Sequence, residues 1–103
     1  MSSHVFDREK WVSLPVLDQL GNIGSEVGRS MNAIRRKDEA ALDGAFRRGI
    51  DLIDASASVL PKYRRRELMS ARELFLRSVE LRQPDERLEA YFMQYAIAAR
   101  AGR

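Results

Sequence analysis

The stretch QLGNIGSEVGRSM, residues 19–31, decides the fold, because three glycines stand inside a pattern that is otherwise helical. Large apolar side chains recur there at steps of three and four, as they do along one face of an α-helix. Gly21, Gly24 and Gly28 lie on or beside that face. Each glycine costs a helix about 1 kcal/mol relative to alanine. Small residues on one face let the backbone of a second helix approach closely, so we expect a tight helix contact there.

Two kinds of neighbour are open for this glycine seam, to which Gly49 in the following segment can contribute. The first is another helix of the same chain, in which case the small residues serve the core. The second is a helix of a second copy or of another protein. A phosphate-binding glycine loop is disfavoured, because that loop joins a strand to the start of a helix, whereas these glycines lie within a helix.

Apolar stripes of helical spacing continue along the chain and predict four helices. Their expected ranges are 14–36, 38–58, 61–81 and 84–101. Asp38 is placed to cap the second helix, and Pro61 and Pro84 suit the starts of the third and fourth. No stretch alternates with the period of a strand, and no Asn-Gly or Asp-Gly pair joins two β-rich runs. Short breaks between helices favour antiparallel neighbours, so we predict an all-α, up-down four-helix bundle.

Length and composition are those of one small domain. Residues 1–12 have no clear period and are expected to form a flexible lead-in, with Trp11 as an anchor, while residues 13–103 form the single helical-bundle domain. The chain has no cysteine, which excludes disulfides and thiolate chemistry. No apolar run approaches the roughly 20 residues that span a bilayer, and the N-terminus has no apolar signal core. We therefore expect a soluble, cytoplasmic protein without a membrane partner.

Positive charge is concentrated at the expected start of the third helix. The net charge is +3 overall, whereas residues 61–82 alone carry +4 and residues 38–60 carry −3. Of the 18 basic residues 15 are arginines, which suit bidentate contacts with carboxylate or phosphate, although GC-rich coding also explains the preference. The candidate phosphate-binding residues are Arg35, Arg36, Lys62, Arg64, Arg65 and Arg66.

This basic cluster opposes the dipole of the helix it begins, so something is expected to compensate it. Asp51 and Asp54, near the end of the preceding helix, can supply that compensation within the chain. The alternative is an exposed patch for RNA or DNA phosphates, with Tyr63 beside it as a stacking ring.

No group of residues matches a catalytic or metal-binding set, and we predict that the chain is not an enzyme. The single histidine, His4, cannot build a triad or a two-histidine metal site. A di-metal site in a helical bundle uses Glu-x-x-His motifs, and none is present. Glu26, which flanks the glycine seam, is the acid expected to be half-buried, paired with Arg29 or a basic residue of the third helix. We predict no catalytic residue, no cofactor, no metal and no small-molecule substrate.

Two blocks, NIGSEVGR (residues 22–29) and YFMQYAIAAR (residues 91–100), resemble blocks carried by small, uncharacterised prokaryotic helical-bundle proteins. AFRRGIDLIDASA and RRRELMSARELF stand between them in the same order, so the resemblance covers residues 11–100. It implies a helical bundle and no particular activity. A weaker likeness, in size and architecture alone, is to the four-helix proteins of the ribosomal intervening-sequence and retroelement-accessory group, which are basic oligomers linked to nucleic acid.

Two functions follow as hypotheses. The first is a non-enzymatic interaction module that forms a homo-oligomer or acts as an adaptor for another protein, motivated by the glycine seam and the aromatic residues Tyr91, Phe92 and Tyr95. The alternative is a nucleic-acid accessory protein that contacts RNA or DNA phosphates through arginines of the first and third helices.

Overall fold

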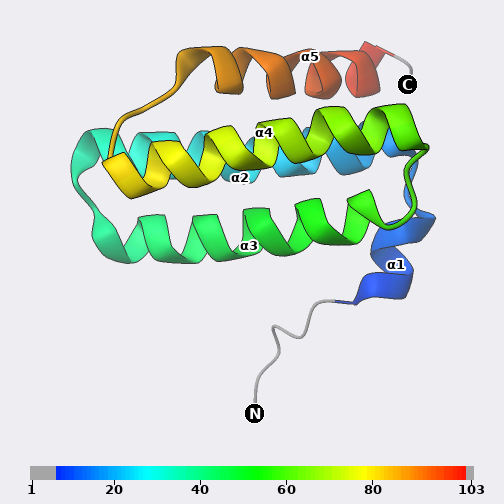
Figure 1. Ribbon diagram of the computed structural model, residues 1–103, viewed down its shortest axis with the longest axis horizontal. Coiled ribbons are helices and arrows are strands. Elements are labelled where there is room, and N and C mark those ends of the chain that lie inside the picture. The colour runs from blue at the N-terminus through cyan, green and yellow to red at the C-terminus, as the bar shows by residue number, and fades with distance from the viewer. Residues whose placement is uncertain (1–6, 102–103) are drawn as a thin grey trace.

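The computed structural model describes residues 7–101, which form helices joined by short connections, with no strand among them (Figure 1). The helices are α1 (Arg8–Ser13), α2 (Val16–Arg36), α3 (Glu39–Ala57), α4 (Lys62–Leu81) and α5 (Glu86–Ala101). The prediction of an all-α fold is therefore confirmed. Helices α2 to α5 occupy the four ranges expected from the apolar stripes, each beginning one or two residues later than predicted.

Helix α1 was not among the predicted elements. Residues 8–12 of this helix belong to the segment expected to form a flexible lead-in, and the structure has them helical, while residues 1–6, including His4, lie outside the described part. Asp7 caps α1 by accepting a hydrogen bond from the backbone N–H of Lys10 at 3.2 Å. Six residues are too few to show a helical period, and long-range contacts supply the stability that so short a helix lacks.

Trp11 holds α1 against the rest of the molecule, as its expected role of anchor requires. The indole is buried, and its Nε1–H donates to the hydroxyl of Ser56 on α3 at 2.9 Å. Ser56 donates in turn to Oε1 of Gln19 at 2.8 Å, and the Gln19 amide donates to the carbonyl oxygen of Leu14 at 2.9 Å. This chain of hydrogen bonds satisfies polar groups that burial would otherwise make costly.

Helix ends follow local chemistry. Pro15 and Pro61 stand immediately before α2 and α4, at the N-cap position. Asp38 caps α3 as predicted, with its carboxylate accepting from the N–H of Ala41 at 3.0 Å. Helices α2 and α4 both end at a residue in the left-handed conformation, Lys37 (φ 56°) and Arg82 (φ 54°), which is a common way to terminate a helix.

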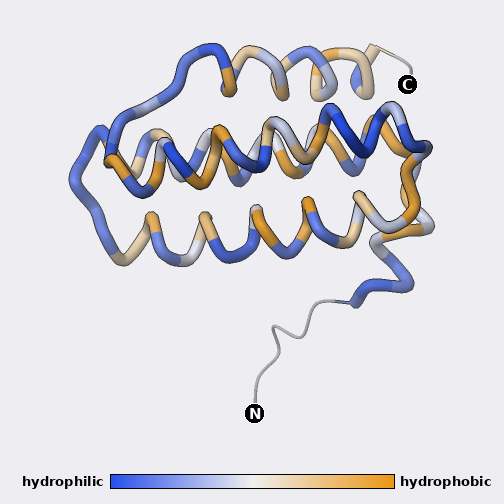
Figure 2. The backbone as a smooth tube through the Cα atoms, viewed as in Figure 1, coloured by the Kyte–Doolittle hydropathy of each residue, from blue (hydrophilic) through white to orange (hydrophobic). Residues whose placement is uncertain are grey.

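Helix α2 is the central element of the packing. It makes its most extensive contacts with α3 on one side and α5 on the other, while α4 lies against α3 and, more loosely, against α2 and α5. The direction of the chain alternates from α2 to α5 in Figure 1. Figure 2 shows the hydrophobic turns of α3 facing the other helices and its hydrophilic turns facing outward. The fully buried large side chains include Leu20, Ile23, Met31, Leu42, Ile53, Leu68, Phe75, Leu88 and Phe92.

Ion pairs connect the ends of helices that are distant in sequence. Arg35 near the end of α2 binds Glu89 near the start of α5, and Arg82 after α4 binds Glu39 at the start of α3. Hydrogen bonding to Arg82 lowers the pKa of the Glu39 carboxyl. Among residues 7–101, no helix combines the length and the hydrophobicity that a membrane span requires.

Candidate functional site

Helix α5 approaches α2 closely at two of the α2 glycines, Gly21 and Gly24. A Cβ placed on Gly24 would stand 2.7 Å from the Cβ of Phe92, and one placed on Gly21 would stand 3.3 Å from the Cα of Ala96. Both separations are shorter than ordinary van der Waals contacts, so these two positions exclude a larger side chain. Because Gly21 and Gly24 have no side chains, α5 of the same chain packs directly against the backbone of α2.

Gly49 and Gly28 differ from this pair in what they face. On α3, a Cβ at Gly49 would meet the ring of Phe75 at 2.9 Å, so this glycine seats a side chain of α4. Gly28 has nothing within 4 Å of the same position. It lines a groove of about 370 Å³ between α2 and α5, together with Arg29, Asn32 and Met93 among others. Helix α5 therefore covers the predicted seam at Gly21 and Gly24 and leaves it open at Gly28. The expectation that Gly49 contributes to this seam is wrong, because Gly49 lies at a separate contact with α4.

The outer side of α5 is an exposed stripe with an apolar middle. We use the name outer stripe for five exposed residues of α5, which are Glu86, Ala90, Met93, Ile97 and Arg100. They follow one another at steps of four and three, which places them on one face of the helix. Met93 is 53% exposed and Ile97 is 56% exposed, whereas Leu88, Phe92 and Tyr95 are buried on the opposite face. Helix α5 is therefore apolar on two faces, and the described residues cover one of them.

The basic start of α4 is compensated, but not by the aspartates that the sequence suggested. Arg65 reaches back to the end of α3, where its Nε donates to the carbonyl oxygen of Ala57 at 2.8 Å and its Nη2 to that of Leu60 at 3.1 Å. Helix α3 has no basic residue in its last turn. Arg65 supplies the missing cation, because antiparallel packing puts the start of α4 beside the negative end of the α3 dipole.

The proposed pairing of the basic cluster with Asp51 and Asp54 is therefore wrong. Asp54 binds Arg72, about two turns beyond the basic cluster on α4, in a bidentate pair at 2.8 and 3.2 Å. Asp51 is exposed and makes no ion pair with any other residue of the described range. The positions of these residues along the two helices do not by themselves determine which turn of α4 faces Asp54.

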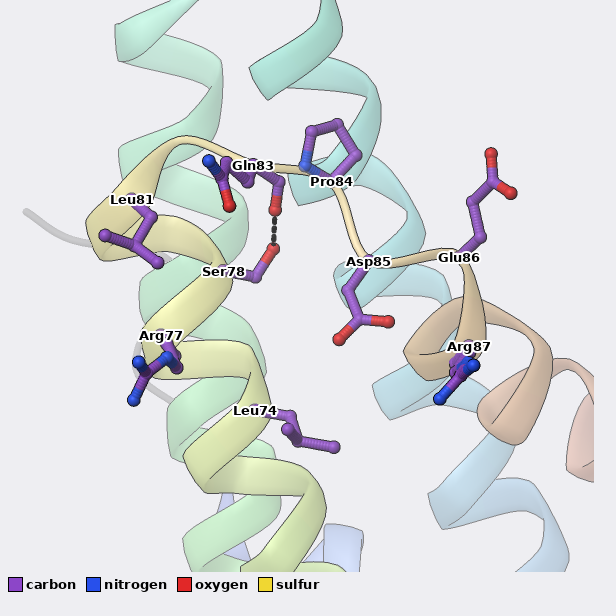
Figure 3. A pocket seen from close by; sticks show the side chains of 9 residues that line it. All are labelled: Leu74, Arg77, Ser78, Leu81, Gln83, Pro84, Asp85, Glu86 and Arg87. Atoms are coloured by element: carbon purple, nitrogen blue, oxygen red, sulfur yellow. Dashed lines mark hydrogen bonds between the residues drawn. The ribbon is translucent and has the colours of Figure 1, made fainter.

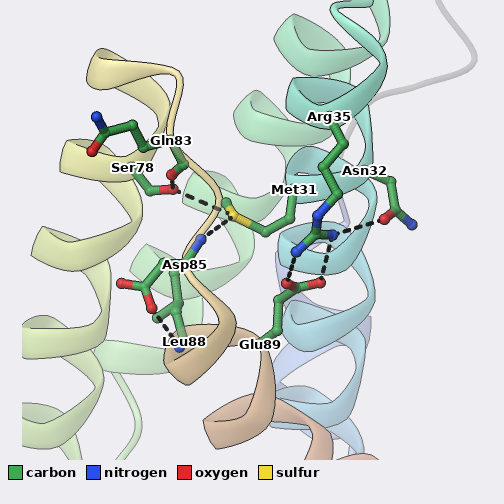
Figure 4. Close-up of polar contacts among 8 residues, drawn as sticks. All are labelled: Met31, Asn32, Arg35, Ser78, Gln83, Asp85, Leu88 and Glu89. Atoms are coloured by element: carbon green, nitrogen blue, oxygen red, sulfur yellow. Dashed lines mark hydrogen bonds and ion pairs between the residues drawn. The ribbon is translucent and has the colours of Figure 1, made fainter.

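Several candidate phosphate-binding residues are engaged inside the molecule. Arg35 binds both carboxylate oxygens of Glu89, at 2.5 and 3.3 Å, and also donates to Asn32 (Figure 4). Arg36 lies 4.0 Å from Asp38. Arg64 donates to the hydroxyl of Tyr95 at 3.3 Å and lies over the rings of Tyr95 and Tyr63. Lys62 and Arg66 form no ion pair within residues 7–101, and Tyr63 is 69% exposed beside them.

The carboxylate of Glu67 on α4 accepts hydrogen bonds from two tyrosine hydroxyls of α5. Oε1 of Glu67 accepts hydrogen bonds from Tyr91 at 2.6 Å and from Tyr95 at 2.9 Å. These two bonds, with a smaller contribution from the nearby Arg64 guanidinium, lower the pKa of the Glu67 carboxyl. Burial and the same carboxylate raise the pKa of Tyr91. The cluster joins α4 to α5 along an edge where the two helices otherwise touch little.

Glu26 was expected to be half-buried, and it is more deeply buried than that, with 9% of the residue exposed. Its Oε2 binds Arg29 at 3.1 Å and Arg48 of α3 at 3.2 Å, while Oε1 is buried and has no hydrogen-bond partner. The predicted pair with Arg29 is confirmed. The second cation, Arg48, belongs to α3, which is the second predicted helix, and not to the third predicted helix, which is α4.

A hollow of about 450 Å³ lies where the chain passes from α4 to α5, between Leu74 and Leu81 on one side and the first turn of α5 on the other (Figure 3). Arg77 and Arg87 stand on opposite sides of it. Ser78, which lines the hollow, donates a hydrogen bond to the carbonyl oxygen of Gln83. The hydroxyl of Ser78 and the N–H of Asp85 also contact the sulfur of Met31, which ties this turn to the core (Figure 4).

Metal ligands and buried polar groups determine what chemistry the described residues could support. Within residues 7–101, no three His, Asp or Glu side chains gather in a way that could hold a metal ion. Among the buried polar groups, Trp11, Ser56 and Gln19 are hydrogen-bonded to one another, whereas Oε1 of Glu26 has no hydrogen-bond partner. The described surface also presents an apolar stripe on α5 and, on α4, the exposed cations Lys62, Arg66 and Arg77, which form no ion pair among residues 7–101.

Sequence reasoning missed the outer stripe, although a signal for it was present. The apolar pattern of residues 84–101 predicts a single stripe, whereas the structure has a second, exposed one on the same helix. A search for a second stripe at steps of four and three would have found Ala90, Met93 and Ile97.

Comparison with family models, with curated proteins and with solved structures finds no match for this chain. Its function has to be argued from this geometry.

Proposed function

We propose that this chain is a non-enzymatic helical interaction module that binds a protein partner through the outer stripe of α5. The scaffold we propose for it is an up-down bundle of α2 to α5 with the short α1 appended. The observation that carries the proposal is that α5 is apolar on both faces while only one face is covered. An amphipathic surface helix normally keeps its outward face polar.

The free energy available from this face is modest. Full burial of a methionine or isoleucine side chain contributes about 1.5–3 kcal/mol, and roughly half of each side chain is still exposed, so Met93 and Ile97 together offer about 2 kcal/mol. The groove beside Gly28 borders Met93 and extends the surface that a partner can cover. These quantities suit a reversible complex better than a permanent one.

Site-directed photo-crosslinking in the cells that produce the protein tests this proposal. A photoreactive residue at position 97 should give discrete covalent adducts with a partner, because a bound partner covers that position. The same residue at position 51, which is exposed on α3, is the matched control and should give none. Equal adduct patterns at the two positions, or no adduct at position 97, would contradict the proposal.

A second candidate function is binding of nucleic-acid phosphates at the start of α4. Lys62 and Arg66 favour it, because they are exposed cations outside any ion pair of the described range, with the Tyr63 ring available for stacking. Arg64 and Arg65 are engaged within the fold, which reduces the number of cations on offer. Fluorescence anisotropy with single-stranded RNA across a salt series tests it: binding that weakens as salt rises, and weakens further in Lys62→Ala, is required.

A further inference from the structure

We infer that the partner of the outer stripe is a second copy of this chain, with the two α5 helices packed antiparallel about a two-fold axis near Met93. This inference rests on the proposed function and names its partner. It is argued from the order of charges along the outer stripe, from the exposed apolar middle, and from the position of α5 at the edge of the molecule (Figure 1).

The outer stripe has opposite charges at its two ends. Glu86 lies in the first turn of α5 and Arg100 in the last, with Ala90, Met93 and Ile97 between them. A rise of 1.5 Å per residue separates the two charges by about 21 Å along the helix. Neither residue forms an ion pair within residues 7–101, and Glu86 acts on Arg35 only through space.

Such a stripe is complementary to itself when it is turned end to end. In an antiparallel pair, Glu86 of each copy faces Arg100 of the other, and Ala90 faces Ile97, so a small side chain meets a large one. Met93 falls next to the two-fold axis, where its flexible, unbranched side chain can pack against its own copy. A closed two-fold pair of this kind uses the same patch on both copies.

A parallel pair is disfavoured by the same charges. It would place Glu86 against Glu86 and Arg100 against Arg100, and like charges across an interface oppose association. The order of charges therefore selects orientation as well as partner. Each charge also suits the dipole of its own helix, but that effect acts on helix stability and not on the choice of partner.

The expected dimer is weak and depends on concentration. Helix α5 has 16 residues and is about 24 Å long, so one helix face provides less than the roughly 800 Å² per partner that stable complexes bury. We expect reversible association that is visible when concentration is varied, and weaker charge contributions at high salt.

A charge-swap series followed by sedimentation equilibrium tests the inference. The proteins are the full chain, Glu86→Arg, Arg100→Glu, the double swap and the control Asp51→Arg, each checked for helix content and studied from about 10 μM to about 1 mM. Each single swap replaces two attractions by two repulsions and should raise the dimer's dissociation constant about tenfold. The double swap should restore it, an equimolar mixture of the two single swaps should form a heterodimer, and the control should match the full chain.

The outcomes separate this inference from the function on which it rests. A full chain that stays monomeric over the whole range overturns self-pairing, as do single swaps that associate as well as the full chain, since a parallel pair would behave in that way. If the full chain is monomeric while position 97 still crosslinks to a different protein, self-pairing is wrong and the interaction module stands. If neither association nor crosslinking occurs, both are wrong.

Discussion

Gly24 and Phe92 are in such close contact that a single added carbon at Gly24 would stand 2.7 Å from the Cβ of Phe92. A Cβ is fixed by its backbone, so neither side could yield without moving a helix. This contact seats α5 on α2 and directs the buried face of α5, with Leu88 and Tyr95, toward the core. The opposite face, with Met93 and Ile97, is turned outward as a consequence.

Gly24→Ala should destabilise the protein even though alanine is the better helix former. The propensity gain is about 1 kcal/mol, and overpacking against Phe92 costs typically 1–3 kcal/mol, so we expect a net loss of about 1 kcal/mol. A loss of that size lowers the Tm of a domain this small by about 4–8 °C in thermal unfolding followed by circular dichroism. Gly28→Ala is the matched control on the same helix. Nothing lies within 4 Å of its new Cβ, so it should raise the Tm; a fall of the same size in both variants would contradict the account.

Ser56→Ala should destabilise the fold by about 1–3 kcal/mol, because it removes the buried hydroxyl that accepts from the Trp11 indole N–H and donates to the Gln19 amide oxygen. Urea unfolding followed by tryptophan fluorescence measures this loss, since Trp11 is the sole tryptophan of the chain. Ser58→Ala, on the exposed turn after α3, is the control and should change the unfolding free energy much less. Equal effects in the two serine variants would show that the Trp11–Ser56–Gln19 connection contributes nothing of its own.

Arg65→Ala should lower the free energy of unfolding by about 1 kcal/mol, because two carbonyl groups at the end of α3 lose a charged donor. Arg66→Ala removes the same charge one residue further on and should be close to neutral, since Arg66 makes no ion pair among the described residues. Chemical denaturation of both variants at the same ionic strength distinguishes the two roles. A greater loss in Arg66→Ala would refute the capping role of Arg65.

Glu67 should make stability dependent on pH in the acid range. Its pKa in the folded protein lies below the ordinary value of 4.5, so the ionised carboxylate stabilises the fold above pH 4.5 and this contribution is lost as the pH falls through the lowered folded pKa. Glu67→Gln should lose less stability than the unmodified chain between pH 7 and acid pH, as measured by urea denaturation at each pH. Tyr91→Phe, which removes one of the donors, should also reduce the difference. A variant that retains the full pH dependence would show that other carboxylates account for it.

The fold could be predicted well from sequence where the apolar period is long. Helices α2 to α5 span four or more turns each, so their stripes and the flanking prolines and Asp38 determined their extents to within two residues. Helix α1 was missed because six residues hold too little of a pattern, and its stability comes from the tertiary contact of Trp11 with Ser56. That contact joins residues 45 positions apart, and no local pattern encodes it.

The candidate site was less predictable, because it depends on which turns face each other. The glycines indicated a close helix contact, but spacing alone could not distinguish Gly24, which α5 covers, from Gly28, which it leaves open. The arginines were named correctly as a cluster, yet the rotation of α4 decides that Arg65 caps α3 and that Arg72 takes Asp54. Side-chain partners of exposed residues follow from helix orientation, which a single sequence does not specify.

The most direct test of the central claim, that the outer face of α5 pairs with a second copy of the chain, is a dilution series of the ¹⁵N-labelled protein followed by NMR. On raising the concentration, we predict progressive chemical-shift changes at the amides of Ala90, Met93 and Ile97, and unchanged shifts at Lys62 and Arg66 on α4. Shifts that do not depend on concentration, or changes centred on the start of α4 instead of α5, would contradict the account.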